Sequence, residues 1–175
     1  MPMETVIPFI EHARIESRCD EIVRALPIAG DYNVISIEAG SKRFADALVY
    51  RIGHGAVRIL VKVHTYAGTS STYSPRLNDA DLVKLKQADY RRPTLLIDDI
   101  CDSGRTLCYV QSLVPETVIT IVLLDKPDNH TCPVRLDHRG FEVPGNMFFV
   151  GYGMDCNGRY RDLDYVGVLP QKPPL

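Results

Sequence analysis

The stretch LLIDDICDSGRTL, residues 95–107, decides the fold of this chain. Three apolar residues, which with Thr94 predict a short buried strand, are followed at once by two aspartates and a polar turn. A helical pattern then runs from about Arg105 to Leu113. Strand, turn and helix in this order form the repeating unit of parallel α/β sheets. The stretch therefore predicts a parallel sheet flanked by helices.

The segments on either side repeat the same alternation. Apolar runs or alternating patterns predict further strands, and amphipathic spacing predicts further helices. Ser41 is a candidate N-cap for the second helix. Residues 64–76 are polar and rich in Gly, Ser and Thr, so we expect a long mobile loop there. The predicted strands are 33–37, 57–63 and 117–124, and the predicted helices are 9–26, 41–52 and 79–87.

The length of 175 residues suits one domain with a substantial core. From Lys126 onward, Pro, Gly and aromatic residues dominate and the helical rhythm stops. We expect a sheet core over about 28–125 and a small hood built from 1–27 and 126–175. The hood should lie over the carboxyl edge of the sheet, where open α/β sheets bind ligands.

Composition excludes several classes of function. The net charge of −2 predicts no binding of bulk nucleic acid. No apolar run approaches the ~18 residues of a membrane span, so no membrane partner is expected. The first residues are acidic and lack the basic region of a signal peptide. These features predict a cytoplasmic protein.

The chain has five cysteines, an odd number, and no C-x-x-C pair. This pattern indicates neither a disulfide framework nor a zinc ribbon. We expect reduced thiols that act as small hydrophobic side chains. Cys101 lies inside the central stretch, but no activating base stands beside it in the sequence.

The polar half of the central stretch predicts a phosphate site. Residues 102–106 offer backbone N–H groups, two hydroxyls and a helix N-terminus to one point, which is how a phosphate monoester is held. Gly104 lets the backbone approach the ligand closely. The G-x-x-x-x-G-K-[ST] pattern of a P-loop is absent.

Asp98 and Asp99 directly follow the predicted strand. Two adjacent carboxylates at this position can accept hydrogen bonds from a diol or hold a divalent cation. Taken alone, the pair also fits a simpler interpretation, in which acidic residues cap the next helix.

The whole thirteen-residue stretch closely resembles the 5-phosphoribosyl-1-pyrophosphate (PRPP) signature of type I phosphoribosyltransferases. The resemblance implies that Asp98 and Asp99 face the ribose hydroxyls of PRPP and help to hold Mg²⁺. It further implies that the 5-phosphate is bound by Asp102, Ser103, Gly104, Arg105 and Thr106.

Three later segments resemble the hypoxanthine-guanine branch of that family. They are LLDK at 123–126, GFEVP at 140–144 and FFVGYGMDCNGRYRDLDYVG at 148–167. With the central stretch, they extend the likeness over roughly residues 35–168.

The likeness implies roles for five residues, each with a simpler alternative. Lys126 would contact the 6-oxo group of a purine, or be a solvated lysine. Phe148 would stack on the base, or be core. The backbone of Phe149 would read the edge of the base. Asp155 would bind Mg²⁺ beside the purine and Arg161 would contact pyrophosphate, or the two would form a surface ion pair.

Two loops match the family less well. The pyrophosphate loop corresponds to Glu38, Ala39 and Gly40, where the family has a basic residue followed by glycine. We expect Glu38 to point away, toward a partner subunit, while Lys42 or Arg43 supplies the missing positive charge. The flexible lid corresponds to the segment that begins at His64, with contacts from Thr65 and Tyr66.

The resemblance therefore implies a purine salvage enzyme that transfers the phosphoribosyl group of PRPP to hypoxanthine or guanine. Mg²⁺ is the expected cofactor, Asp102 the expected proton acceptor, and a homodimer or homotetramer the expected assembly. A xanthine- or guanine-preferring transferase is one alternative. A regulator that retains the fold as a PRPP sensor is another.

Overall fold

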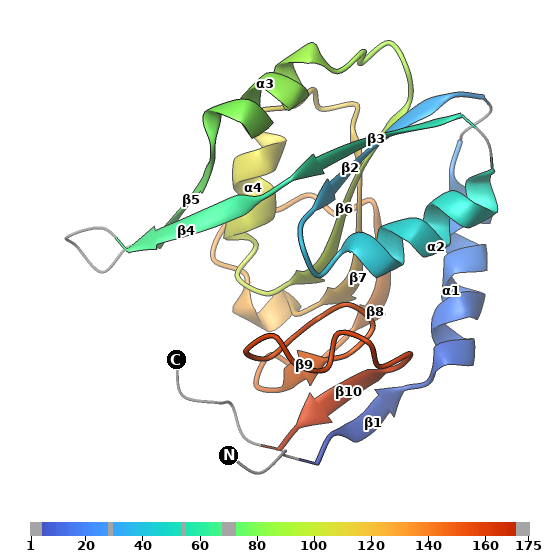
Figure 1. The fold of residues 1–175 in the computed structure, drawn as a ribbon, viewed down its shortest axis with the longest axis vertical. Helices are drawn as coiled ribbons and strands as arrows, with labels where there is room; N and C mark the ends of the chain where they lie inside the picture. Colours follow the sequence, from blue (N-terminus) through green and yellow to red (C-terminus); the bar gives the residue numbers. More distant parts are fainter. Residues whose placement is uncertain (1–4, 28–29, 54, 68–72, 171–175) are drawn as a thin grey trace.

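A five-stranded sheet lies at the centre of the computed structural model, which describes residues 5–27, 30–53, 55–67 and 73–170 (Figure 1). The strand order is β3-β2-β6-β7-β8, and every neighbouring pair is parallel. The predicted α/β fold with a parallel sheet is thereby confirmed. The strands are β2 (Tyr32–Ile37), β3 (Ala56–Val61), β6 (Thr94–Cys101), β7 (Ile119–Asp125) and β8 (His138–Glu142).

Helices cover both faces of this sheet. On one face, α1 (His12–Ala25) and α2 (Lys42–Ile52) share a buried cluster with Leu95 and Ile97 of β6. On the other face, α3 (Asp79–Gln87) and α4 (Arg105–Gln111) pack on a cluster that contains Leu96. Because successive strand residues point to opposite faces, a strand buried on both sides reads as a continuous apolar run.

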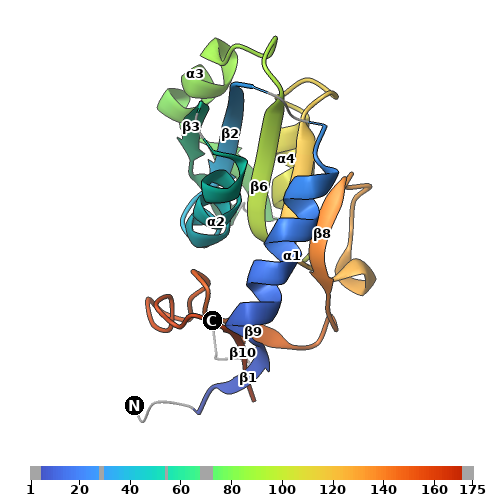
Figure 2. The same cartoon turned by 90° about the vertical axis from the view of Figure 1, so that its right-hand side faces the viewer.

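A second, smaller sheet is antiparallel and has the order β1-β10-β9. Helix α1 connects it to the main sheet (Figure 2). The loop after β9 reaches the carboxyl edge of the main sheet, since a Cβ on Gly153 would lie 2.4 Å from the carbonyl oxygen of Gly40. The strands are β1 (Ile7–Ile10), β9 (Phe148–Val150) and β10 (Val166–Leu169).

Parts of the two segments that we expected to form the hood belong to the main sheet and its helical layer instead. Strand β8 comes from the 126–175 segment but pairs with β7 in the main sheet. Gly140 permits this close pairing, because a Cβ there would lie 2.4 Å from the carbonyl oxygen of Leu123. Helix α1 comes from the N-terminal segment but packs on α2 and β8.

The prediction of a long mobile loop at 64–76 is wrong for most of that segment. Strands β4 (Val63–Ala67) and β5 (Tyr73–Leu77) form an antiparallel pair (Figure 1). Residues 68–72 lie outside the described part of the chain. Pairing between two polar strands depends on cross-strand contacts, which local composition does not reveal.

Two local expectations also need correction. Ser41 stands at the N-cap position of α2, but its hydroxyl donates to the carbonyl oxygen of Ile37 at 2.5 Å and does not cap the helix. Cys108 and Cys132 are joined in a disulfide with a Cα–Cα distance of 6.9 Å, so not all cysteines are free thiols. A bond between residues 24 apart depends on how α4 and the later loop pack.

Among the residues that the structure describes, none of the helices combines the length and the apolar character needed to cross a membrane.

Candidate active site

The two adjacent carboxylates lie near the carboxyl end of β6. Asp98 is 6% exposed, and one of its carboxylate oxygens accepts a hydrogen bond from the backbone N–H of Asp99 at 3.0 Å. Asp99 in turn accepts from the N–H of Ile100 at 3.0 Å. These bonds hold the two carboxyl groups in fixed positions beside each other.

Burial raises the pKa of both groups. The pKa of Asp98 is raised well above its usual range, first by desolvation and then by the neighbouring Asp99 charge. The pKa of Asp99 is also raised by desolvation, while hydrogen bonds and the Arg161 charge oppose the rise. A divalent cation or a diol placed at this pair would relieve the unfavourable burial, since both interact favourably with carboxylate oxygens.

The segment predicted to bind phosphate, residues 102–106, lies in the turn after β6 and at the start of α4. Gly104 has a φ of 77°, a left-handed conformation that favours glycine, and it directly precedes α4. The Nε of Arg105 donates to the hydroxyl of Thr131 at 3.1 Å, which ties the loop to a later segment. A cavity of about 80 Å³ opens here, lined by Asp98, Ile100, Cys101, Asp102, Ser103, Gly104, Thr106 and Leu107.

Asp102 is held at both carboxylate oxygens. Lys126 Nζ donates to one of them at 2.9 Å, and Asn129 Nδ2 donates to the other at 2.7 Å. Asn129 also donates to the carbonyl oxygen of Gly145 at 2.9 Å. The side chain of Asp102 is nevertheless 51% exposed, so the carboxylate remains accessible to a ligand.

Lys126 follows β7 and is 5% exposed. Its Nζ lies 5.6 Å from the centroid of the Phe149 ring, which is itself buried and packs at 5.3 Å against Phe9. Phe148 stands beside Phe149 on β9 and is half-buried. A buried cation, a carboxylate and the aromatic ring of Phe149 therefore come together from the ends of β6 and β7 and from β9.

The predicted pyrophosphate loop follows β2 and packs directly on the carboxylate pair. A Cβ on Gly40 would lie 1.6 Å from Asp99 Oδ2, so a side chain cannot be placed there without displacing Asp99. Glu38 and Ala39 are exposed, and the N–H of Glu38 donates to the carbonyl oxygen of Val61 at 2.8 Å.

The two basic residues expected to compensate Glu38 have other partners. Lys42 pairs with Asp46 on the surface of α2 at 2.9 Å. Arg43 donates to the carbonyl oxygen of Leu163 at 2.8 Å and lies over the ring of Tyr152. Arg43 thus fastens α2 to the loop after β9.

Asp155 and Arg161 form an ion pair at 2.7 Å. The second carboxylate oxygen of Asp155 accepts from the N–H of Gly158 at 2.7 Å, and Arg161 also donates to the carbonyl oxygen of Gly153 at 2.7 Å. The simpler interpretation of these residues, an ion pair, therefore describes this conformation. For either side chain to reach a ligand, the pair must open.

The arrangement brings most of the predicted site residues to one edge of the main sheet. Thr65 and Tyr66 lie on β4, but their side chains are outside the described part of the structure. Sequence reasoning missed Asn129, which reaches Asp102 because the 3-10 helix η1 (Pro127–Asn129) turns the chain back after Lys126. The Pro after Lys126 was the only local signal of such a turn.

Comparison with known proteins places these features in a family. The model of the phosphoribosyl transferase domain matches residues 21–157. A hypoxanthine-guanine phosphoribosyltransferase of Lactococcus lactis is 35% identical over 140 residues, which cover 78% of this chain and 74% of that protein.

Two further proteins show the range of the similarity. The bifunctional protein TilS/HprT of Listeria innocua is 36% identical over 148 residues, which are 81% of this chain but only 22% of that longer protein. A structure of the hypoxanthine phosphoribosyltransferase of Trypanosoma cruzi, in complex with the product IMP, aligns with a TM-score of 0.74. It is 25% identical, and the alignment covers 97% of this chain and 96% of that one.

Proposed function

The chain belongs to the phosphoribosyltransferase family, in its hypoxanthine-guanine branch, and from this premise we propose that it transfers the 5-phosphoribosyl group of PRPP to a 6-oxopurine. The products are the nucleoside 5′-monophosphate and pyrophosphate. The observation that carries the proposal is the contact between buried Lys126 and accessible Asp102 beside the phosphate loop.

The Lys126–Asp102 pair is complementary to one edge of a 6-oxopurine. Such a base presents an acceptor, the 6-oxo oxygen, next to the imidazole N–H. Lys126 Nζ donates to the 6-oxo oxygen. The Asp102 carboxylate, whose Oδ2 lies 2.9 Å from Lys126 Nζ, accepts from the imidazole N–H. As the new glycosidic bond forms, the purine becomes more acidic and Asp102 takes its proton or shares it in a hydrogen bond. Phe148, half-buried on β9, supplies a face on which the base stacks.

The ribose phosphate of PRPP lies along the carboxyl end of β6 in this proposal. The 5-phosphate occupies the cavity lined in part by Asp102, Ser103, Gly104 and Thr106, where backbone N–H groups of this turn would bind it. Asp98 and Asp99 accept hydrogen bonds from the ribose hydroxyls. Their carboxylate oxygens are also the kind of ligand that Mg²⁺ prefers, and Mg²⁺ when bound would supply positive charge for the departing pyrophosphate.

Arg161 and the loop at 38–40 receive the pyrophosphate. Arg161 must leave Asp155 to do so, which frees the Asp155 carboxylate for a cation at the same moment. The β4–β5 pair, which contains the candidate lid residues Thr65 and Tyr66, closes over the site and keeps water from the oxocarbenium-like sugar.

Two expectations extend this proposal. Its proposed substrate PRPP is a highly charged phosphate that does not cross membranes unaided, so we place the protein in the cytoplasm. We also expect it to assemble as a homodimer or homotetramer, with exposed Glu38 turned toward the partner.

A base-selectivity assay tests the function. Purified protein is incubated with PRPP, Mg²⁺ and each of hypoxanthine, guanine, xanthine and adenine, and nucleotide formation is followed by absorbance. We expect turnover of hypoxanthine and guanine. Adenine should be disfavoured by ~10⁴ or more, because its amino group would face the Lys126 donor. Comparable rates with adenine would contradict the proposed base site.

A further inference from the structure

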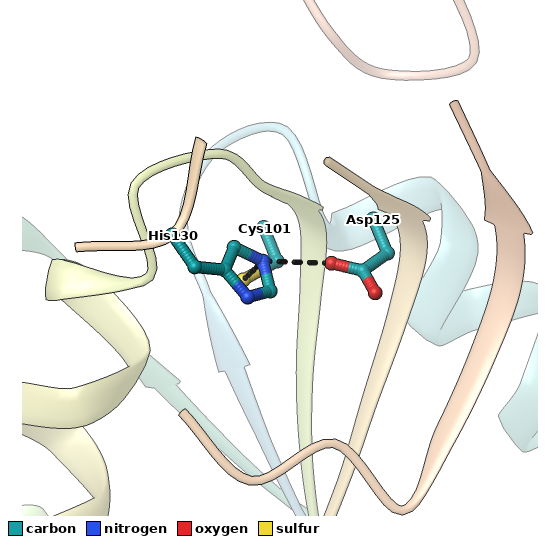
Figure 3. A group of neighbouring side chains, drawn as sticks. All are labelled: Cys101, Asp125 and His130. Carbon is teal, nitrogen blue, oxygen red and sulfur yellow. Dashed lines mark hydrogen bonds and ion pairs between the residues drawn. The ribbon is translucent and has the colours of Figure 1, made fainter. Parts of the chain in front are cut away.

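Three potential metal-binding side chains cluster behind the phosphate loop: Cys101, Asp125 and His130 (Figure 3). Cys101 ends β6 and Asp125 ends β7, and the two are partners in the parallel register. His130 follows the 3-10 helix η1. One ligand atom from each residue lies within 4.8 Å of the other two.

The contacts within the cluster meet at one ring nitrogen. His130 Nε2 lies 3.2 Å from Cys101 Sγ and 2.8 Å from Asp125 Oδ1. In a nucleophilic Cys-His-Asp relay the two ring nitrogens are used separately, one for the thiol and one for the carboxylate. Here a single nitrogen faces both partners, as Figure 3 shows, so the geometry does not suit such a relay.

The carboxylate of Asp125 is buried without an aligned hydrogen bond. The residue is 1% exposed, and neither of its oxygens accepts a hydrogen bond of acceptable angle from any described residue. Oδ1 is nevertheless 2.8 Å from His130 Nε2, and Oδ2 is 2.9 Å from Arg139 Nη1. The Asp125–His130 contact is therefore short but lacks a matching hydrogen-bond angle, whereas the Cys101–His130 contact is a hydrogen bond, and both contacts end on the same ring nitrogen.

We propose that Cys101 Sγ, Asp125 Oδ1 and His130 Nε2 bind a zinc-class transition-metal ion, with water as the fourth ligand. Thiolate, imidazole and carboxylate together favour Zn²⁺ over Mg²⁺, which takes oxygen ligands. In a tetrahedral Zn²⁺ site the ligand bonds require about 3.6 Å between S and N and about 3.3 Å between N and O. The observed 3.2 and 2.8 Å are each about half an ångström shorter, so small rotations of these side chains admit the ion.

The surrounding contacts support a site of this kind. Arg139 holds the second oxygen of Asp125 and so orients the first. The N–H of Lys126 donates to the carbonyl oxygen of Cys101 at 2.9 Å, and the N–H of His130 donates to that of Pro127 at 3.3 Å, which fixes the backbone of all three ligands. On binding, the Cys101 thiol releases its proton to solvent as the metal–sulfur bond forms. The ion would cross-link β6, β7 and the loop that carries Asn129.

Cobalt spectroscopy of the full chain tests the proposal. Chelator-treated protein in excess Mg²⁺, which occupies the oxygen-only sites, is titrated with Co²⁺ and then with Zn²⁺. We expect one Co²⁺ per chain with a thiolate-to-cobalt charge-transfer band, and displacement of that band by one equivalent of Zn²⁺. Absence of the band from the wild-type protein would overturn the proposal.

Variants identify the ligands. Cys101→Ser and His130→Ala should abolish the band and weaken Zn²⁺ binding by more than the ~100-fold known for residues that only orient a ligand. His138→Ala should keep both properties, since His138 lies on β8 outside the cluster. A Cys108→Ser/Cys132→Ser variant should keep the band as well, which rules out the disulfide sulfurs as its source.

Folding of each variant is checked by circular dichroism. If Cys101→Ser does not fold, His130→Ala decides, because His130 lies on a loop and is partly exposed. A full band in a folded Cys101→Ser or His130→Ala protein would show that the thiolate and the histidine do not bind the metal together.

Discussion

Lys126 Nζ lies 2.9 Å from Asp102 Oδ2, and the lysine is almost fully buried while the aspartate side chain is half exposed. A buried cation is stable only when it is paired, and here Asp102 provides the pairing. The other Asp102 oxygen is held by Asn129 at 2.7 Å. The carboxylate that the mechanism assigns to proton transfer is thus oriented on both sides before any base binds.

Replacing Asp102 by Asn should lower kcat by ~10²–10⁴, the usual contribution of a general acid or base, while PRPP affinity is largely kept. The amide has the same shape but cannot accept a proton. Steady-state kinetics with hypoxanthine and a separate PRPP titration measure the two effects. Asp128→Asn, the same change at an exposed position in η1, is the control and should be neutral. A normal kcat in the Asp102→Asn enzyme would show that Asp102 has only a structural role, as the partner of Lys126.

The Asp98–Asp99 pair should make stability depend on pH. Their folded-state pKa values are raised, so the folded state holds protons that the unfolded state has already released. Stability therefore falls as pH rises from the usual carboxyl pKa of about 4 through the raised pKa of the folded state. Above the raised pKa, the folded protein carries the full destabilisation that comes from burying charged carboxylates.

Asp98→Asn should remove the destabilisation that comes from burying the Asp98 charge. We expect it to raise the free energy of unfolding at pH 7 by ~0.5–2 kcal/mol, the range of typical single stabilising changes, and to weaken PRPP binding. Below about pH 4 the stability difference should vanish, because the carboxyl is then protonated in both states. Thermal unfolding at the two pH values measures this, and a variant less stable than wild type at pH 7 would contradict it.

Gly40→Ala should disrupt the site through sterics alone. A Cβ at this position would lie 1.6 Å from Asp99 Oδ2, so the loop or the carboxylate must move. Misplacement of about 1 Å costs ~10²-fold in rate, and we expect a loss of that order in kcat/KM for PRPP. Ala39→Gly removes an exposed methyl from the same loop and should have little effect. Equal kinetics for the two variants would show that the loop does not contact PRPP.

Glu38→Lys should weaken assembly and leave the PRPP dissociation constant nearly unchanged, because the exposed carboxylate is assigned to a subunit interface. Sedimentation and PRPP titration of the same sample separate the two effects. Glu116→Lys, an equal change of charge at another exposed position, is the control. An unchanged oligomer with markedly tighter PRPP, by an amount that falls with salt, would instead place Glu38 at the pyrophosphate.

The helices and central strands could be predicted because their signals are local. The apolar run before Asp98 forms the first half of β6, which continues to Cys101, and the helix predicted at 79–87 has the same limits as α3. The apolar spacing at Ile15, Cys19 and Ile22 is the buried face of α1. Each of these patterns lies within one element, where the period of burial appears directly in the order of residues.

Other features depend on which elements become neighbours. The polar strands β4 and β5 pair with each other, and β8 joins the main sheet through a glycine that permits close approach. The local amino-acid composition carries no signal of either pairing, so neither could be predicted from it.

The sequence by itself determined the parallel sheet, the strand–turn–helix around 95–107 and the residue types available at the carboxyl edge. Tertiary structure alone decided that Asn129 reaches Asp102, 27 residues away, that Arg161 pairs with Asp155, and that His130 meets Cys101, 29 residues away. The physical reason is that secondary structure follows short-range periodicity, whereas contacts between side chains depend on how the strand ends and loops pack together in space.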